Sequence, residues 1–150
     1  YGDHRDLHLS LRRQRQMCIR DRSETLKNNG FKIYSGGTDT HLMLVDLRPF
    51  NVKGNLAAES LSRANITCNK NGIPFDSESP MITSGIRLGS QAATTRGFSL
   101  KEFEKVGELI TKVIDGLSKN PNDNSKTEDE VRKEVVSLCS SFPIYKNLRK

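Results

Sequence analysis

The sequence has few of the features that build secreted, membrane-bound or metal-stabilised proteins. It contains no Trp, and aromatic residues make up 6% of its 150 residues. No apolar run approaches the roughly 18 residues that a membrane-spanning helix needs, and no N-terminal stretch has the order of a secretory signal. The three Cys are widely spaced and form no CxxC pair, which argues against a disulfide framework and a zinc site. These absences favour a cytoplasmic protein with no metal and no membrane partner.

What the chain does contain is charge, and that charge is unevenly placed. Charged residues make up 28% of the sequence, hydrophobic residues 34%, and the net charge is +6. Residues 1–22 hold six Arg against three Asp, so half of the positive excess lies in this head. An Arg-rich arm can bind nucleic-acid phosphates, and a polar tail of this kind can equally be disordered.

A third interpretation of the head is that it does not belong to the protein. Residues 10–22 resemble translated sequencing adaptor joined to a truncated gene. We favour this interpretation over a binding arm and over a disordered tail, so no function is assigned to residues 1–22.

Beyond the head, apolar spacing predicts one α/β domain over residues 23–150. Strands are expected at 31–34, 41–47, 66–68 and 86–88, and helices at 55–64 and in the last third of the chain. A few short strands with helices among and after them predict a two-layer domain, in which the C-terminal helices pack on one face of the sheet.

The clearest predicted element is a helix that begins after Ser99. Ser99 and Glu102 form a capping box, and Phe98 and Phe103 occupy the positions of a hydrophobic staple. A second Ser/Thr-x-x-Glu pattern predicts that the last helix begins at Thr127.

Two patterns near residue 38 have both a chemical and a plain structural interpretation. The Ser-Gly-Gly-Thr turn at 35–38 can cradle a phosphate through backbone N–H groups, but it lacks the lysine of a P-loop and is typical of an ordinary turn. Asp39 and His41 can act as an acid–base pair, although such a pair is more often structural.

Arg87 is a stronger candidate, because it lies on a short expected strand between Gly85 and Gly89. A guanidinium held there can meet a carboxylate with two parallel hydrogen bonds, although a surface arginine without a ligand fits the same pattern. Arg96 shares this ambiguity. The long polar loop over 69–80 is expected either to bind a ligand or to be a plain surface loop.

Six short motifs follow one another along the chain in a specific order. They are Ser35-Gly36-Gly37-Thr38-Asp39-Thr40-His41, Arg63-Ala64-Asn65-Ile66-Thr67, Asn69-Lys70-Asn71, Ser79-Pro80, Thr83-Ser84-Gly85-Ile86-Arg87-Leu88-Gly89 and Thr95-Arg96-Gly97-Phe98. This order closely resembles serine hydroxymethyltransferase of the bacterial type, from about Ser23 to Tyr145. The resemblance covers the C-terminal small domain of that enzyme. It implies the type I fold of pyridoxal-phosphate enzymes, with a small, mostly antiparallel sheet and helices packed on one face.

The resemblance also implies a reaction and a set of binding residues. The family interconverts serine plus tetrahydrofolate with glycine plus 5,10-methylenetetrahydrofolate, using pyridoxal 5'-phosphate. By motif match, Arg87 grips the substrate carboxylate and Asn71 contacts the folate. The family's Ser-Pro-Phe segment lines the folate site and reads Ser79, Pro80, Met81 here, where Met81 can fill the same apolar contact.

The catalytic groups of the family are expected to lie outside this chain. The Schiff-base Lys, the cofactor Asp and the ring-stacking His belong to a large domain that would precede Ser23, so no catalytic residue is assigned here and the chain alone is expected to be inactive. The whole enzyme is expected to be a cytoplasmic homodimer or homotetramer, with no nucleic-acid or membrane partner. Two other functions stay open: a free-standing domain that binds folate or an amino acid, and a nucleic-acid-binding module built on the Arg-rich head.

Overall fold

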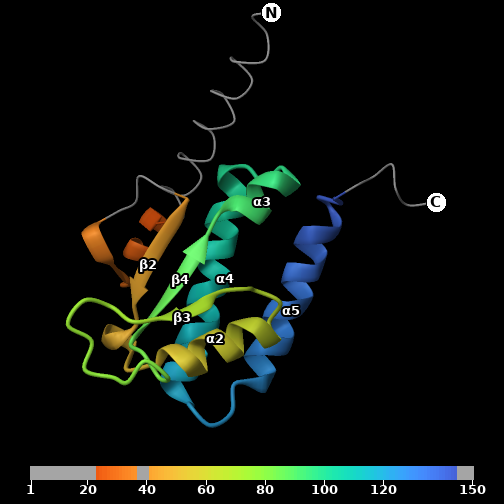
Figure 1. Cartoon of the computed structure of the whole chain (residues 1–150). Helices are drawn as coiled ribbons and strands as arrows, with labels where there is room; N and C mark the ends of the chain where they lie inside the picture. Colours follow the sequence, from red (N-terminus) through yellow and green to blue (C-terminus); the bar gives the residue numbers. More distant parts are fainter. Residues whose placement is uncertain (1–22, 37–40, 145–150) are drawn as a thin grey trace, which may run out of the picture.

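A four-stranded antiparallel sheet and a layer of helices make up residues 23–36 and 41–144, the part of the chain that the computed structural model describes (Figure 1). The strands are β1 (Lys32–Ile33), β2 (Leu42–Asp46), β3 (Asn69–Asn71) and β4 (Gly85–Gly89), in the order β1-β2-β4-β3. The helices are α2 (Gly54–Arg63), α3 (Gln91–Arg96), α4 (Leu100–Lys119) and α5 (Ser125–Ser140), with 3-10 turns η1 (Tyr34–Gly36) and η2 (Arg48–Phe50). Residues 23–28 are also helical. The predicted α/β architecture with a small antiparallel sheet is confirmed.

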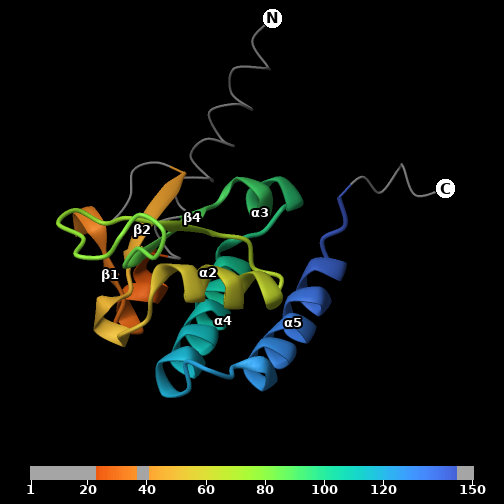
Figure 2. The same ribbon diagram turned by 60° about the horizontal axis from the view of Figure 1, so that its bottom comes forward.

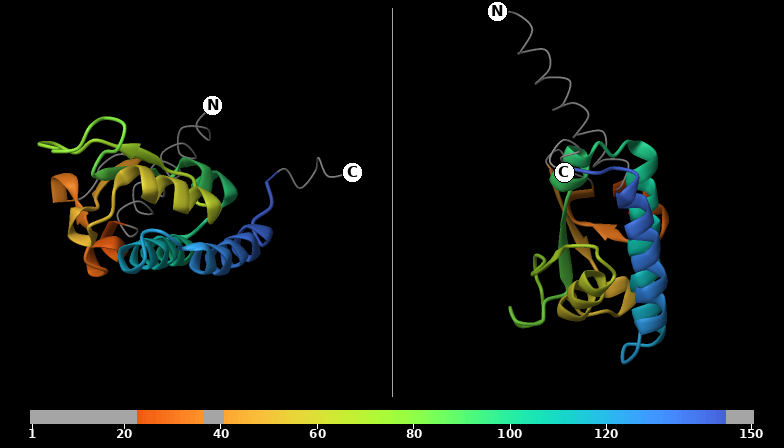
Figure 3. Two further views of the ribbon diagram at one scale, coloured as in Figure 1. Left: turned by 90° about the horizontal axis from the view of Figure 1, so that it is seen from below. Right: turned by 90° about the vertical axis from the view of Figure 1, so that its right-hand side faces the viewer.

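One face of the sheet is buried against helices, because side chains alternate between the two faces of a strand. Met43 and Val45 of β2 and Ile86 and Leu88 of β4 are buried on this face. They share one apolar core with side chains of α2, α4 and α5: Ala57, Leu61, Leu109, Ile110, Val113, Ile114, Val131 and Val135. The three helices pack on one another, and α4 and α5 form a layer on the side of the molecule away from the loop that follows β3 (Figures 2 and 3).

The start of α4 is as the sequence predicts. Ser99 is the N-cap and forms a capping box with Glu102, whose carboxylate accepts the Ser99 N–H at 2.7 Å. The rings of Phe98 and Phe103 meet edge to face, with their centroids 6.1 Å apart. Phe142, beyond the end of α5, packs on Phe98 with 5.0 Å between centroids. This aromatic contact joins the end of α5 to the start of α4.

The strand expected at 66–68 is wrong. Helix α2 ends at Arg63, and residues 66–68 connect it to β3: Asn65 has a left-handed φ of 63°, and the N–H of buried Ile66 donates to the Leu61 carbonyl at 2.8 Å. The apolar run is thus the hydrophobic contact of a helix C-terminus. The edge strand β3 follows in the polar segment Asn69–Asn71, because backbone pairing with β4 is enough to hold an exposed edge.

The second predicted capping box is also wrong, because α5 begins at Ser125 and not at Thr127. The N-cap residue is Asn124, whose side chain donates to the Val113 carbonyl at 3.0 Å and does not cap its own helix. The neighbouring Asp123 carboxylate accepts from the N–H and the hydroxyl of Ser125, at 3.1 and 2.7 Å. Asp123, one position before the N-cap, therefore accepts the hydrogen bonds at the helix start that the pattern assigned to Thr127.

Some predictions fall on positions outside the described residues. They include the head at 1–22, Asp39, and Gly37 and Thr38 of the Ser-Gly-Gly-Thr turn. Among the helices that the structure describes, none is both long enough and apolar enough to cross a membrane.

Candidate functional site

Arg87 lies in the middle of β4, on the sheet face turned away from the helices. The register pairs it with Leu44 of β2 and Asn69 of β3, and cross-strand partners share a face. Its side chain is exposed, and within the described part of the chain it makes no hydrogen bond and no ion pair. The arginine singled out by the sequence is therefore presented to solvent, and no described residue uses its donors.

The two glycines that flank Arg87 have different roles. Both lie two residues from Arg87, so added side chains would share its face. A Cβ on Gly85 would lie 2.6 Å from the side chain of Ile73 and 2.8 Å from the Val45 carbonyl oxygen, so this position has no room for one. At Gly89 the nearest atom would be at 3.5 Å, an ordinary contact. Gly85 thus lets the loop approach the strand, whereas a side chain at Gly89 would meet Leu42 and the His41 carbonyl only at ordinary contact distances.

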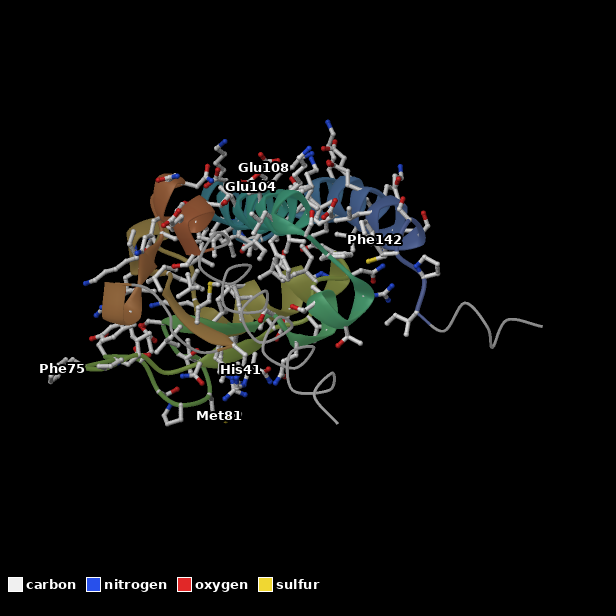
Figure 4. The ribbon with its side chains drawn as sticks, turned by 90° about the horizontal axis from the view of Figure 1, so that it is seen from above. His41, Phe75, Met81, Glu104, Glu108 and Phe142 are labelled. Atoms are coloured by element: carbon white, nitrogen blue, oxygen red, sulfur yellow. The ribbon has the colours of Figure 1, made fainter. Side chains whose placement is uncertain are left out.

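The loop of residues 72–84 connects β3 to β4 and exposes apolar side chains. Phe75 is 96% exposed and Met81 is 74% exposed. In Figure 4 both residues, together with His41 directly before β2, lie on the side of the molecule away from the labelled glutamates of α4. The loop therefore stands on the same side of the protein as the open face of the sheet.

The residues that the sequence assigned to folate fall into two places. Asn71 ends β3, on the same sheet face as Arg87, and its amide nitrogen donates to the Gly72 carbonyl at 2.7 Å. Ser79, Pro80 and Met81 are exposed in the far part of the loop. The structure thus brings the strand residues and the loop residues to one side of the domain.

Asp76 closes the loop onto the start of β4. Its Oδ1 accepts from the Ser84 hydroxyl at 2.6 Å and the Glu78 N–H at 3.0 Å, and its Oδ2 accepts from the Ser84 N–H at 2.9 Å and the Ile73 N–H at 3.2 Å. Partial burial would raise the pKa of Asp76, but the hydrogen bonds from Ser84, Glu78 and Ile73 outweigh it and hold this pKa well below its usual range. Sequence reasoning missed this carboxylate, because nothing in a loop aspartate indicates which donors it will meet.

The turn into β4 is held in an unusual conformation. Thr83 is buried and has a left-handed φ of 61°, which is rare for a β-branched residue. Its hydroxyl donates to the Gly85 carbonyl at 3.2 Å, and its own carbonyl accepts the Gly54 N–H at 2.9 Å. A Cβ on Gly54 would lie 2.2 Å from the Thr83 hydroxyl oxygen. The hydrogen bonds of Thr83 with Gly85 and Gly54, and the close approach of Gly54, therefore fix the backbone that leads into the strand of Arg87.

Two other reactive side chains are not available to this site. Arg96 donates to the Phe142 carbonyl at 3.1 Å and so joins α3 to the end of α5. The helix α3 itself was not predicted, because it has only six residues before Gly97, whose φ is 92°. Burial raises the pKa of the Cys68 thiol to about 11, which keeps it protonated and a poor nucleophile.

Comparison with known proteins gives the site a family context. The sequence profile of the serine hydroxymethyltransferase family matches residues 11–110. The chain is 86% identical over 127 residues to the serine hydroxymethyltransferase of Pelagibacter ubique (strain HTCC1062), which covers 85% of this chain and 29% of that protein. The corresponding proteins of Paramagnetospirillum magneticum and of a Marinomonas species are 62% and 59% identical, over 82% and 83% of this chain and 29% of each relative.

The chain therefore spans about 29% of the length of the curated relatives that it matches. The profile match begins at residue 11, inside the head that the sequence analysis set apart. Neither a free-standing binding domain nor a nucleic-acid-binding module is favoured by these matches. The chain belongs to the serine hydroxymethyltransferase family, whose members have the type I fold of pyridoxal-phosphate enzymes, and the predicted fold class is confirmed.

Proposed function

We propose that residues 23–150 are the C-terminal small domain of a serine hydroxymethyltransferase. The whole enzyme would interconvert serine and tetrahydrofolate with glycine and 5,10-methylenetetrahydrofolate. Besides the family, one observation supports this function: Arg87 stands exposed in the middle of the open sheet face, with no partner among the described residues. A planar guanidinium in this state suits a carboxylate, which accepts two parallel charge-assisted hydrogen bonds from it.

The described residues fit a cofactor that is held mainly by another part of the enzyme. Pyridoxal phosphate, when bound, withdraws electrons from the α-carbon of the amino acid. Lys70, the middle residue of β3, donates to the Met81 carbonyl at 2.7 Å, and its sequence surroundings do not match the motif of the family's cofactor-linking lysine. We therefore assign the cofactor-linking lysine, the cofactor aspartate and the ring-stacking histidine to the part of the enzyme that this chain does not span.

In this proposal Arg87 contributes orientation. By holding the carboxylate at a fixed point of a short strand, it determines which bond of the α-carbon stands toward the cofactor. Positioning of this kind can supply a large part of a rate enhancement, because the reacting groups no longer have to find their geometry. The rigid turn through Thr83 and Gly85 supports this role by fixing the start of the strand.

The second substrate is proposed to bind beside Arg87, against Asn71, Ser79, Pro80 and Met81. The Asn71 side chain is held by its hydrogen bond to the Gly72 carbonyl, so its amide has a defined direction. Met81, at 74% exposed, offers apolar surface to the ring system of a folate.

The assembly and location of the whole enzyme belong to the same proposal. We assign it to the cytoplasm as a homodimer or homotetramer, with serine, glycine and folate as its ligands and with neither nucleic acid nor membrane as a partner. Cys68 and Cys139 are free thiols, as is usual in a reducing compartment.

The function is tested by joining residues 23–150 to the preceding part of the Pelagibacter ubique relative. We expect this chimera to bind pyridoxal phosphate and to convert serine to glycine only when tetrahydrofolate is present. Arg132→Ala, an exposed arginine of α5, is the matched control for Arg87→Ala, and we expect it to keep full activity. A chimera that binds the cofactor but converts no serine with Arg87 intact would contradict the proposed function.

A further inference from the structure

Asp76 links two parts of the chain that the proposed function uses for different substrates. On one side is the loop of residues 72–84, with the exposed residues assigned to folate. On the other side is β4, with Arg87. Two of the four hydrogen bonds of Asp76 go to Ser84, directly before the first residue of β4, and two go to the loop backbone at Ile73 and Glu78.

Ser84 is itself fixed to the sheet. Its side chain is buried, its carbonyl accepts the Leu47 N–H at 2.9 Å, and its hydroxyl and N–H both go to Asp76. Every polar group of Ser84 is therefore engaged. A carboxylate bonded twice to this residue is held as firmly as the strand that follows.

Three other side-chain contacts are made to residues 74–81 of the loop, and they are weaker anchors. Lys53 pairs with Glu78 at the surface, Lys70 donates to the Met81 carbonyl, and the Tyr34 hydroxyl donates to the Pro74 carbonyl at 3.1 Å. These contacts are exposed and use long side chains, and exposed ion pairs contribute little. Asp76 is partly buried and accepts four hydrogen bonds, each strengthened by its negative charge.

We propose that Asp76 is a positioning residue that joins the loop to the strand of Arg87, so that the binding sites of the two substrates keep one fixed spacing. The inference rests on the proposed function. Transfer of a one-carbon unit between two substrates requires their reacting atoms to be held at a set separation. A loop bonded directly to the strand that anchors the amino acid meets this requirement.

The carboxylate form of the side chain is essential to this role. Each oxygen of Asp76 accepts two hydrogen bonds, whereas an asparagine has one oxygen and would turn an NH₂ group toward two donors. Asp76→Asn therefore loses at least half of the link at nearly constant size. Ser84→Ala is a milder change, because it removes only the hydroxyl bond.

Asp123 provides a matched control elsewhere in the chain. Its Oδ1 accepts both the N–H and the hydroxyl of Ser125 at the start of α5, whereas Asp76 uses both of its oxygens for Ser84. Asp123→Asn can keep both bonds through its one oxygen, so it removes a carboxylate charge of the chain without touching the loop of residues 72–84.

The test compares these variants in the full-length chimera described above. For Asp76→Asn we expect the KM for tetrahydrofolate to rise about tenfold and kcat to fall by about the same factor, because misplacement of one substrate weakens both binding and reaction. Serine affinity, measured by calorimetry without folate, should stay within about threefold, since Arg87 itself is unchanged. Hydrogen exchange of the peptide covering 72–84 should be faster, and Asp123→Asn should change none of these values.

The inference would be overturned by unchanged KM and kcat in a folded Asp76→Asn protein, or by an equal loss in Asp123→Asn. If Asp76→Asn does not fold, Ser84→Ala decides: a smaller rise in the KM for tetrahydrofolate supports the inference, and no rise contradicts it. If the unsubstituted chimera is inactive, the proposed function fails separately. The exchange comparison then still decides whether Asp76 holds the loop, and unchanged exchange would overturn the link.

Discussion

The helix layer and the open face of the sheet differ in how their charged side chains are partnered. Where α5 meets α2, Glu128 is buried: both its oxygens accept from the Arg63 guanidinium at 2.7 Å, and one also accepts from the Ser60 hydroxyl at 2.6 Å. On the open face, Arg87 has no partner within the described residues. A buried charge has lost its contact with water and needs partners within the chain, whereas an exposed charge is solvated and stays available to bind a ligand. The first arrangement serves stability and the second serves binding.

The network around Glu128 connects three helices. Asn124, at the start of α5, donates to the Ser60 hydroxyl of α2 at 3.2 Å and to the Val113 carbonyl of α4 at 3.0 Å. A Cβ on Gly116 would lie 2.1 Å from the Asn124 side-chain oxygen, so α4 can approach only with a glycine there. Changes in this network should affect unfolding, and changes at Arg87 should affect substrate binding.

The largest effect is expected for Arg87→Ala in the chimera. Serine affinity should fall by about 3–5 kcal/mol, because the substrate carboxylate would be desolvated without a partner. The serine affinity of Arg87→Lys should lie between those of Arg87→Ala and the unsubstituted chimera. Lysine keeps the positive charge but cannot make the two parallel hydrogen bonds of a guanidinium. Calorimetric titration with serine measures the change, and the thermal midpoint should stay within about 2 °C. A large drop in the midpoint would show that Arg87 belongs to the fold and would remove the contrast between the helix layer and the open face.

For Glu128→Gln we expect a loss of stability and an unchanged affinity for serine. The free energy of unfolding should fall by about 2 kcal/mol, because a neutral amide leaves buried donors poorly satisfied, while the half-exposed Arg63 can still reach water. Urea unfolding of the chain measures this loss, and serine affinity of the chimera should not change. Glu130→Gln is the control: Glu130 pairs with Lys112 at the surface and should cost less than about 0.5 kcal/mol. Equal losses for the two variants would contradict the special role of the buried carboxylate.

The same network predicts a direction of pH dependence. Hydrogen bonds from Arg63 lower the pKa of Glu128 in the folded protein, and the Ser60 hydroxyl adds to them against the effect of burial. A carboxyl group with a lowered pKa contributes its stability fully above its unfolded pKa of about 4.3 and loses it as the pH falls through the folded value. The difference in unfolding free energy between the original chain and Glu128→Gln should therefore be constant from about pH 6 to 8 and shrink below about pH 4. A difference that grows on acidification would contradict this assignment.

The elements with strong local signals could be predicted from the sequence. The cap at Ser99, the staple of Phe98 and Phe103, and the strand of Arg87 are all set by residues close together in the chain. The start of α5 could not be predicted, because the Asn124 side chain is directed to Val113, eleven positions away, and leaves capping to Asp123.

The supporting contacts of the candidate site were missed for a similar reason. The motif that contains Arg87 is visible in the sequence, but the link from Asp76 to Ser84 depends on how a long loop folds back on itself. The network of Glu128 with Arg63 spans 65 positions and has no local pattern at all. Spacing rules describe neighbours along a helix or strand, and tertiary hydrogen bonds lie beyond them.

The smallest effect is expected for removal of residues 1–22. We propose that this head does not pack on the domain, because it carries six Arg and few apolar positions. The thermal midpoint of the shortened chain should remain within about 2 °C of the original. A fall of many degrees would place the head in the fold, in keeping with the family match that begins at residue 11.

The most direct test of the central claim is a crystal structure of the chimera with pyridoxal phosphate and serine. We expect the guanidinium of Arg87 to make two hydrogen bonds of about 2.8 Å to the serine carboxylate, the length typical of charge-assisted pairs. We also expect β4 and the turn at Thr83 to keep their present backbone. A serine carboxylate bound by another residue, with the Arg87 side chain directed into solvent, would contradict the account.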